Sequence, residues 1–524
     1  MNDIAMRVAK LSPAKLELLS RRLSKEIGRQ KQPQVIHRKK SSEPIAPLSF
    51  AQERLWFIYR FEQGNSVYNI HRVFRAAGRL NLPVLERCLS EIVRRHETLR
   101  TTFDEIEGKA VQIVAPAGPV RVPVVDLGEM SPGERETEAF RIGTEESVRL
   151  FDLTRGPLFR ITLLRFAEGD HIVLFTMHHI ISDAWSMGVL VKELVTLYEV
   201  FSKGERSPLG DLPVQYSDFS RWQRQWLQGQ VLDELLSYWT EKMAGANYLL
   251  ELPRDRPRPQ VQSFRGIKQS FVMPKALVDS LKRFSQNNKV TLYTTLLAVF
   301  NVMLYLDTNQ EDILVGCPIA NRSRSETEGL IGFFVNTLVM RTDLSGDPAF
   351  IDLVDRVREV ALGAYSHQDL PFEKLVKALQ PERNLSHTPL IQVVFNFNNT
   401  PTNSVRLSGL SLTPFDAEFT SVKFDLAMHV ISTEKDLTVF VESSADLFTE
   451  ATTRLILWRF RKLMEIALDR PTARLSDLKK EIGEADKEMW VAKERELKEL
   501  RNLKFRGAKR RAVGRSHMRD QEEE

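Results

Sequence analysis

Helix-like and strand-like segments alternate along most of this chain, and this alternation constrains the fold more than any other feature. Between about residues 48 and 470, some segments repeat apolar residues every three or four positions, while others are short runs rich in β-branched and aromatic residues. Such alternation is typical of α/β proteins, in which helices cover the faces of a sheet. The sequence therefore predicts an α/β fold made of two halves of similar size.

The individual elements can be placed from their patterns. Ser49 and Gln52 have the spacing of a helix-capping box, and residues 171–180 form a β-rich run ahead of a helix at about 187–201. The longest apolar stretch, residues 292–306, contains Asn301 and is too short to cross a bilayer, so we expect a buried helix there. Further strands are expected near residues 120–125, 313–317, 336–341 and 392–397, and further helices near 51–61, from Pro83 onward, and near 277–284, 349–365 and 372–379.

Composition divides the chain into four parts. Residues 1–46 contain an amphipathic helix at 12–28 and a linker rich in glutamine and proline, which together form a candidate docking segment. Packing of this helix on a lobe is the alternative to docking on an upstream protein. Residues 47–226 and 227–472 are expected to form an N-terminal and a C-terminal lobe. In residues 473–524 we expect a charged helical and basic extension exposed to solvent, because 25 of the 46 residues from 479 to the end are charged.

The distribution of charge argues against a nucleic-acid partner. The formal net charge is +5, yet residues 1–40 hold eleven Lys/Arg against three Asp/Glu, and residues 501–519 hold eight Lys/Arg and no acid. The body between these ends is acidic, so no basic groove is expected to follow a phosphate backbone.

The two cysteines, Cys88 and Cys317, fit a reducing compartment. We therefore expect a cytoplasmic protein with neither a nucleic-acid nor a membrane partner.

The most informative segment is HHIISDAWS at residues 178–186, where a strand passes through a short turn into a helix. Successive strand residues point to opposite faces, so His178 and His179 cannot both face the same space. A neutral imidazole can accept a proton near neutral pH, and Asp183 can cap the helix or hold an arginine. Adjacent histidines bordering an apolar strand are also common as core residues. One outward histidine and one aspartate are too few ligands for a metal, so no metal site is expected.

Context favours the catalytic interpretation. Residues 178–184 resemble the HHxxxDG signature of the condensation domains of nonribosomal peptide synthetases, which share a fold with chloramphenicol acetyltransferase. The resemblance covers about residues 45–470, and further blocks occur in the family's order. These blocks are SFAQERLW at 49–56, RHETLRTTF at 95–103, YSDF at 216–219 with Trp222, IGFFVNT at 331–337 with Arg341, and HQDLPFE at 367–373.

The resemblance implies a fold and an activity. The fold is two chloramphenicol acetyltransferase-like lobes that meet in a V with a tunnel between them. An upstream donor carrier protein presents an acyl or peptidyl thioester, and a downstream acceptor carrier presents an aminoacyl thioester, each on a 4′-phosphopantetheine arm. The acceptor amine attacks the donor thioester and an amide forms. No cofactor is bound by the chain itself, and adjoining synthetase domains are expected as further partners.

The resemblance also implies roles for single residues. His179 is the second histidine, which projects into the tunnel and either takes the proton of the acceptor amine or orients that amine. His178 and Asp183 are structural, with Asp183 expected to pair with Arg95. Asn336 shapes the tunnel at the crossover between the lobes. The other block positions expected at the tunnel or in structural motifs are Arg100, Trp185, Ser186, Tyr216, Asp218, Trp222 and Gly332.

Simpler interpretations of some of these residues remain open. The alternative for Arg95 and Arg100 is a solvated helix end, and the alternative for Tyr216, Asp218 and Trp222 is ordinary packing at a helix start.

One position departs from the family pattern. Ala184 stands where the family usually has glycine. A methyl group costs almost nothing at negative φ but is strained in the left-handed region, so we expect an ordinary right-handed or extended backbone here. The retained histidine pair argues against the heterocyclisation relatives, in which both histidines are aspartates. The segment after Ala184 and the block at residues 367–373 argue against the epimerisation relatives.

Two alternatives to carrier-to-carrier amide formation stay open. The first is a related acyl transfer to a free amine or alcohol. The second is a catalytically silent platform that recruits other proteins, for which loss of the second histidine would be the sign; His179 is present.

Overall fold

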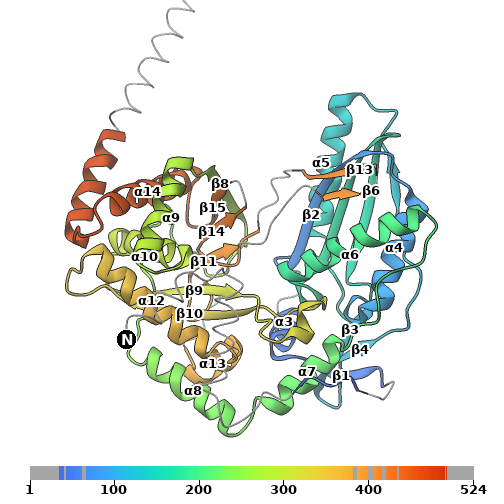
Figure 1. The fold of residues 1–524 in the computed structure, drawn as a ribbon, viewed down its shortest axis with the longest axis horizontal. Coiled ribbons are helices and arrows are strands. Elements are labelled where there is room, and N and C mark those ends of the chain that lie inside the picture. The colour runs from blue at the N-terminus through green and yellow to red at the C-terminus, as the bar shows by residue number, and fades with distance from the viewer. Residues whose placement is uncertain are drawn as a thin grey trace, which may run out of the picture.

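The computed structural model describes residues 35–39, 43–61, 66–381, 386–398, 405–407, 409–415, 421–433, 436–489 and 491. The helix expected at residues 12–28 and the basic stretch at 501–519 lie outside these residues. Figure 1 shows two α/β lobes side by side, splayed at one end and joined at the other through α3 and the segment that contains α7 and α8. The α/β prediction is therefore confirmed, with the two lobes arranged as a V.

The N lobe is built on a mixed six-stranded sheet in the order β12-β13-β2-β7-β6-β5. Apolar residues of β7 point to both faces: Phe175 and Met177 pack with α4 and α6, and Ile172 and Leu174 pack with α5. This double burial explains why the segment is an almost continuous apolar run. A second sheet, in the order β1-β4-β3, lies beside it. The N-lobe elements are β1 (Ile45–Pro47), α3 (Phe50–Phe61), β2 (Asn69–Gly78), α4 (Leu82–Arg95), η1 (Glu97–Arg100), β3 (Thr101–Ile106), β4 (Lys109–Val114), β5 (Val124–Asp126), α5 (Pro132–Val148), β6 (Phe159–Ala167), β7 (Asp170–His178), η2 (His179–Ile181), α6 (Ala184–Ser202) and α7 (Tyr216–Trp226).

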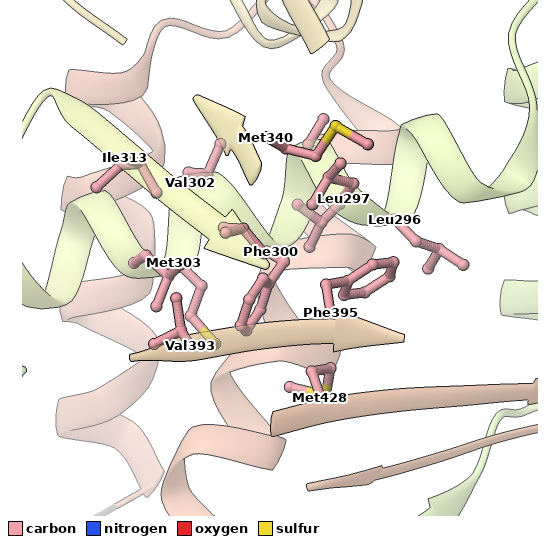
Figure 2. Packing of buried hydrophobic residues seen from close by; sticks show 14 of the residues in the cluster. Leu296, Leu297, Phe300, Val302, Met303, Ile313, Met340, Val393, Phe395 and Met428 are labelled. Atoms are coloured by element: carbon pink, nitrogen blue, oxygen red, sulfur yellow. The ribbon is translucent and has the colours of Figure 1, made fainter. Parts of the chain in front are cut away.

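The C lobe has its own six-stranded sheet, in the order β10-β9-β11-β14-β15-β8. Helix α10 corresponds to the longest apolar stretch, and Figure 2 shows its side chains packed against β9, β10 and β11. The rings of Phe300 and Phe395 lie 5.6 Å apart at the centre of this core. The C-lobe elements are α8 (Gln230–Met243), β8 (Gly266–Val272), α9 (Lys275–Asn287), α10 (Leu292–Thr308), β9 (Asp312–Ile319), α11 (Ser325–Glu328), β10 (Asn336–Asp343), α12 (Phe350–Ser366), α13 (Phe372–Leu379), β11 (Val393–Asn398), β12 (Val405–Leu407), β13 (Leu410–Pro414), β14 (Leu426–Ser432), β15 (Leu437–Ser444) and α14 (Glu450–Asp469).

Among the described residues, no single helix combines the length and the apolarity of a membrane span. Only α9 and α10 taken together meet both conditions, and this pair is bent by 107°. Helix α10 is buried in the C-lobe core, where the Asn301 side chain donates to the Thr342 hydroxyl at 3.1 Å.

The two lobes repeat one arrangement that the sequence does not reveal. In the N lobe, β2 leads to α4, the antiparallel hairpin β6–β7 leads to α6, and β5 runs parallel to β6. In the C lobe, β8 leads to α9, the antiparallel hairpin β14–β15 leads to α14, and β11 runs parallel to β14. The histidine segment therefore occupies a strand-to-helix junction whose counterpart in the C lobe, at the end of β15, carries Ser444 and Ala445.

One C-lobe segment crosses over and completes the N-lobe sheet. Strand β13 pairs antiparallel with β2, and β12 pairs with β13 at the sheet edge. The crossing requires a close backbone approach at Gly78, whose φ is +118°, because a Cβ there would lie 2.2 Å from the carbonyl oxygen of Gly409. The expected division into lobes at residues 226 and 227 is therefore incomplete, since the strands at 405–414 belong to the N-lobe sheet.

The ends of the expected lobes also differ from the sequence-based boundaries. Ile36, in the expected linker, is 2% exposed and packs beside α7. The helical segment at residues 475–489 opens the charged extension, yet Leu475 and Leu478 are fully buried in the C-lobe core. The first part of that extension is thus part of the C lobe, because its apolar residues lie on the side that faces the core.

Candidate active site

The histidine pair lies where β7 ends and α6 has not yet begun. His178 is 7% exposed, its Nδ1 accepts the Ile180 backbone N–H at 3.1 Å, and its ring lies between those of Tyr68 and Phe151. Burial, assisted by the charge of Lys423, lowers the pKa of His178 to about 3. His178 is therefore a neutral packing residue at this junction.

His179 is held in one orientation by its neighbours. Its backbone N–H donates to the Tyr68 carbonyl at 2.8 Å, and its ring meets Phe333 of the C lobe edge-to-face at 5.4 Å. The imidazole Nδ1 lies 3.0 Å from the Ser182 carbonyl oxygen, so Nδ1 carries the proton and Nε2 presents a lone pair. Burial first, and then the charge of Lys423, lower the pKa of His179 well below 6.5. At neutral pH this ring is an uncharged hydrogen-bond acceptor.

Asp183 connects the two lobes beneath the histidines. Its carboxylate caps α6 by accepting the Ser186 N–H at 2.8 Å, and it accepts the Phe334 N–H of the C lobe at 3.0 Å. Its Oδ1 also lies 3.2 Å from Nη2 of Arg322, and both side chains are almost fully buried. Three separate donors thus converge on one carboxylate, two of them from the opposite lobe.

The expected pairing of Asp183 with Arg95 is wrong. Arg95 instead pairs with Glu193, with 3.0 Å between Nη2 and Oε1. Glu193 follows Asp183 by ten residues on α6, which is about 15 Å along the helix, and the end of α4 lies against the later position. Burial raises the pKa of the Glu193 carboxyl, but its contacts with His96 and Arg95 outweigh burial and leave that pKa lowered.

The loop before β10 closes the site from the C-lobe side. The Ser186 hydroxyl donates to the Gly332 carbonyl at 2.8 Å and accepts the Gly332 N–H at 3.0 Å. Nη2 of Arg322 also donates to the Ser186 hydroxyl, at 2.7 Å. Gly332 rests directly on Tyr216, because a Cβ at this position would lie 2.0 Å from the tyrosine ring. Tyr216 in turn donates to the Phe333 carbonyl, so the loop that carries Phe333 is fixed on both sides.

Asn336 secures a different connection. Its amide donates to the carbonyls of Gln368 and Leu370 at 2.9 and 2.7 Å, and its carbonyl accepts the backbone N–H groups of Thr337 and Phe372 at 2.9 Å each. With these four bonds the side chain ties the start of β10 to the block at residues 367–373. These contacts are structural, because they fix the block at residues 367–373 against the start of β10.

The remaining predicted positions make structural contacts rather than contacts with the His179 ring. The Trp185 indole N–H donates to the Glu328 carbonyl at 2.9 Å across the lobe boundary, and Asp218 forms the capping box at the start of α7. Trp222 stacks on Trp226 at 5.1 Å and lies under the guanidinium of Arg324. The Arg100 guanidinium donates to the Ala115 carbonyl. The structure therefore joins His178, His179, Asp183, Ser186 and Gly332 in one place and leaves Arg95, Arg100, Asp218 and Trp222 to scaffold contacts.

Sequence reasoning missed three participants. Arg322 is the ion-pair partner of Asp183, Phe333 contacts the His179 ring, and Lys423 acts electrostatically on both histidines. Phe333 lay within a block already singled out, but Arg322 and Lys423 stood in segments without a motif. Within the described residues, no group of three or more His, Cys, Asp or Glu side chains is placed to hold a metal ion.

Comparison with known proteins identifies the family. The condensation-domain family model matches residues 42–489. One of the linear gramicidin synthase proteins of Brevibacillus parabrevis is 46% identical over 87% of this chain and 9% of its own length. Chondramide synthase cmdD of Chondromyces crocatus is 41% identical over 83% of this chain and 11% of its own length. This chain belongs to the condensation-domain family of nonribosomal peptide synthetases, and it spans about a tenth of the length of these relatives.

Solved structures share the fold. The X-domain from teicoplanin biosynthesis, solved in complex with OxyB, has a TM-score of 0.77 and 26% identity, and the match covers 86% of this chain and 98% of that one. The first condensation domain of the CDA synthetase has a TM-score of 0.67 and 19% identity, over 83% of this chain and 98% of that one. These matches confirm the predicted fold of two chloramphenicol acetyltransferase-like lobes.

Ala184 is the exposed first residue of α6, and its φ is not positive. The expectation of an ordinary backbone at this departure from the family pattern is confirmed. Because Ala184 is exposed, we expect Ala184→Gly to keep the fold, to lower stability by less than about 1 kcal/mol through helix propensity, and to change the rate less than about tenfold. Urea unfolding and single-turnover transfer measure the two effects. A hundredfold rise in rate would mean that the methyl group obstructs the site.

Proposed function

We propose that this chain forms an amide bond between two carrier-bound substrates. An upstream carrier presents a donor acyl or peptidyl thioester on its phosphopantetheine arm, and a downstream carrier presents an acceptor aminoacyl thioester on its own arm. Membership of the condensation-domain family supports this substrate class. The observation that carries the proposal is the neutral, oriented imidazole of His179, whose Nε2 presents a lone pair while Nδ1 is held by Ser182.

The reaction needs little beyond correct positioning. The acceptor amine nitrogen forms a bond to the donor carbonyl carbon, the carbon–sulfur bond breaks, and the proton lost by the amine balances the one that the leaving thiolate takes up. An α-amino group has a pKa near about 8, so part of it is already uncharged at pH 7. His179 accepts a hydrogen bond from this amine. The bond orients the amine so that the lone pair of the amine nitrogen points at the carbonyl carbon of the thioester.

The scaffold residues support this role by fixing the two lobes. Asp183 closely follows the turn that carries His179 in the sequence. It forms a buried ion pair with Arg322 across the lobe boundary. His178 stays neutral and fills the space behind the turn. The buried thiols of Cys88 and Cys317 are free, which supports a cytoplasmic location where thiols stay reduced.

The test uses the full chain and two separately loaded carrier proteins. One carrier bears a panel of acyl and aminoacyl donors, the other bears an aminoacyl acceptor, and mass spectrometry reads the acceptor arm. We expect the acceptor arm to gain the mass of the donor acyl group only when the chain and both loaded carriers are present. Product on a free amine or alcohol, with none on the acceptor arm, would instead support acyl transfer to a free acceptor. A folded chain that forms no product from any pair would support a recruiting platform.

A further inference from the structure

A lysine of the C lobe lies beside the histidine pair of the N lobe. Lys423 precedes β14 in the chain, and its Nζ stands 4.5 Å from the centre of the Tyr68 ring. Tyr68 is the residue whose carbonyl holds the His179 backbone N–H, at 2.8 Å, and its ring lies 6.4 Å from that of His178. The lysine thus contacts the residue whose ring faces His178 and whose backbone carbonyl holds the His179 backbone N–H.

The backbone of Lys423 is anchored on both sides. The Thr388 hydroxyl donates to the Lys423 carbonyl at 3.2 Å. The N–H groups of Val422 and Asp425 each donate to a backbone carbonyl at 2.9 Å. Asp425 is itself 1% exposed and bonded to Arg258. The ammonium group is therefore presented from a fixed support rather than from a freely moving loop.

Among the described residues, the influences that oppose the charge of Lys423 outweigh the one that supports it. The side chain is part-buried, and it forms no ion pair with any residue that the structure describes. Arg54 of α3 faces it with like charge, and Glu442 of β15 is the acidic group that acts on it. An ammonium group that is removed from water without a paired carboxylate is costly, and such groups gather at functional sites.

The titration behaviour agrees with this position. Burial first, and then the charge of Arg54, lower the pKa of Lys423 to about 7, while Glu442 acts in the opposite direction. Lys423 is also the largest contributor after burial to the lowered pKa of both His178 and His179. The charge of Arg72, on β2, acts on His179 in the same direction but more weakly.

We propose that Lys423, in the C lobe, is a positioning residue whose positive charge opposes protonation of the His179 ring in the N lobe. This inference rests on the proposed role of His179 in amide formation. When Lys423 is protonated, the Nε2 lone pair of His179 stays available to the acceptor amine. Because the two groups come from different lobes, this control operates only while the lobes are joined as they are here.

The sign of the pH effect follows from the charges. Below about pH 7, Lys423 is a cation and opposes protonation of His179. Without that cation, the pKa of His179 rises toward its ordinary value, and a larger fraction of the ring is protonated at pH 5.5. Above pH 8 the ring is neutral with or without Lys423, so the change is confined to the acidic side.

The test compares the Lys423→Met and Lys423→Arg variants of the full chain, with Lys268→Met as the matched control. Lys268 also stands over an aromatic ring in the C lobe, 4.7 Å from the centre of Phe440, but it is not among the groups that act on His179. Histidine NMR titration gives the midpoint of His179, with its signal assigned by its loss in His179→Gln. We expect Lys423→Met to raise this midpoint by at least about 0.5 pH unit, while the other two variants leave it within about 0.2 unit.

The pH profile of single-turnover transfer gives the second readout. We expect the acidic limb of the Lys423→Met profile to lie at higher pH than that of the unchanged protein, by the same shift that the NMR midpoint shows, and Lys423→Arg to follow the unchanged profile. An unchanged midpoint in a folded Lys423→Met protein would overturn the inference, and Lys423→Gln gives the same test if methionine prevents folding. The NMR result does not depend on activity. A chain that transfers nothing would therefore contradict the proposed function, while the effect of Lys423 on the titration of His179 could still be measured.

Discussion

Replacing His179 with alanine is expected to lower the rate of amide formation by at least about 100-fold, the low end for a positioned acid–base or orienting group. The reason is geometric: Nδ1 is held by the Ser182 carbonyl, so Nε2 is the ring atom available to the acceptor amine. Single-turnover transfer between two loaded carriers measures the effect directly. The fold should survive, since the ring is only part-buried.

A matched histidine variant separates loss of chemistry from loss of structure. His171 stands at the opposite end of the same strand, β7, and is 5% exposed. We expect His171→Ala to transfer at nearly the normal rate after correction for the folded fraction. If His179→Ala also transferred at nearly the normal rate while folded, another group would have to orient the amine.

Replacing Asp183 with alanine is expected to destabilise the protein by about 3–5 kcal/mol. The substitution leaves the guanidinium of Arg322 buried without its carboxylate, and it removes the acceptor of the Ser186 and Phe334 N–H groups. Urea unfolding, followed by the change in midpoint at constant slope, measures the loss. An unchanged urea midpoint together with lost activity would mean that Asp183 takes part in the reaction rather than in stabilising the fold.

A double-mutant cycle distinguishes the two possible arginine partners. The effects of Asp183→Ala and Arg322→Met should fall short of additivity by at least about 1 kcal/mol, because either substitution alone removes the same contact. Asp183→Ala and Arg95→Met should be close to additive, since Arg95 is bonded to Glu193. The reverse pattern would contradict the pairing seen in the structure.

Local features of this protein were predictable from the sequence because their causes are local. The strand that ends at His178, the cap at Asp183 and the buried helix over residues 292–308 depend on side chains within a few positions of one another. The position of His179 at a strand-to-helix junction followed from the same patterns. The expectation that His179 faces a tunnel came from the resemblance and stays a prediction.

The features that the sequence did not reveal depend on which distant segments meet. Asp183 could have met either arginine as far as charge is concerned, and only the packing of the loop before β10 against α6 selects Arg322. Lys423 carries no motif, and its influence arises because the C lobe places it against Tyr68. The helical segment at 475–489 looks solvated by its charge, although three of its apolar residues face the core.

The crossing of β12 and β13 into the N-lobe sheet bears on how such domains can be recombined. A chimaera that joins the first lobe of one relative to the second lobe of another, cut once between α7 and α8, would seat a foreign strand against β2. A Cβ at Gly78 would clash with the Gly409 carbonyl, so a first lobe with a larger residue at this position of β2 would leave the edge of β2 unpaired. Exchange of the N lobe as a working unit therefore requires that residues 405–414 be exchanged together with it. These residues lie between the C-lobe strands β11 and β14 in the chain, but they pair with the N-lobe sheet.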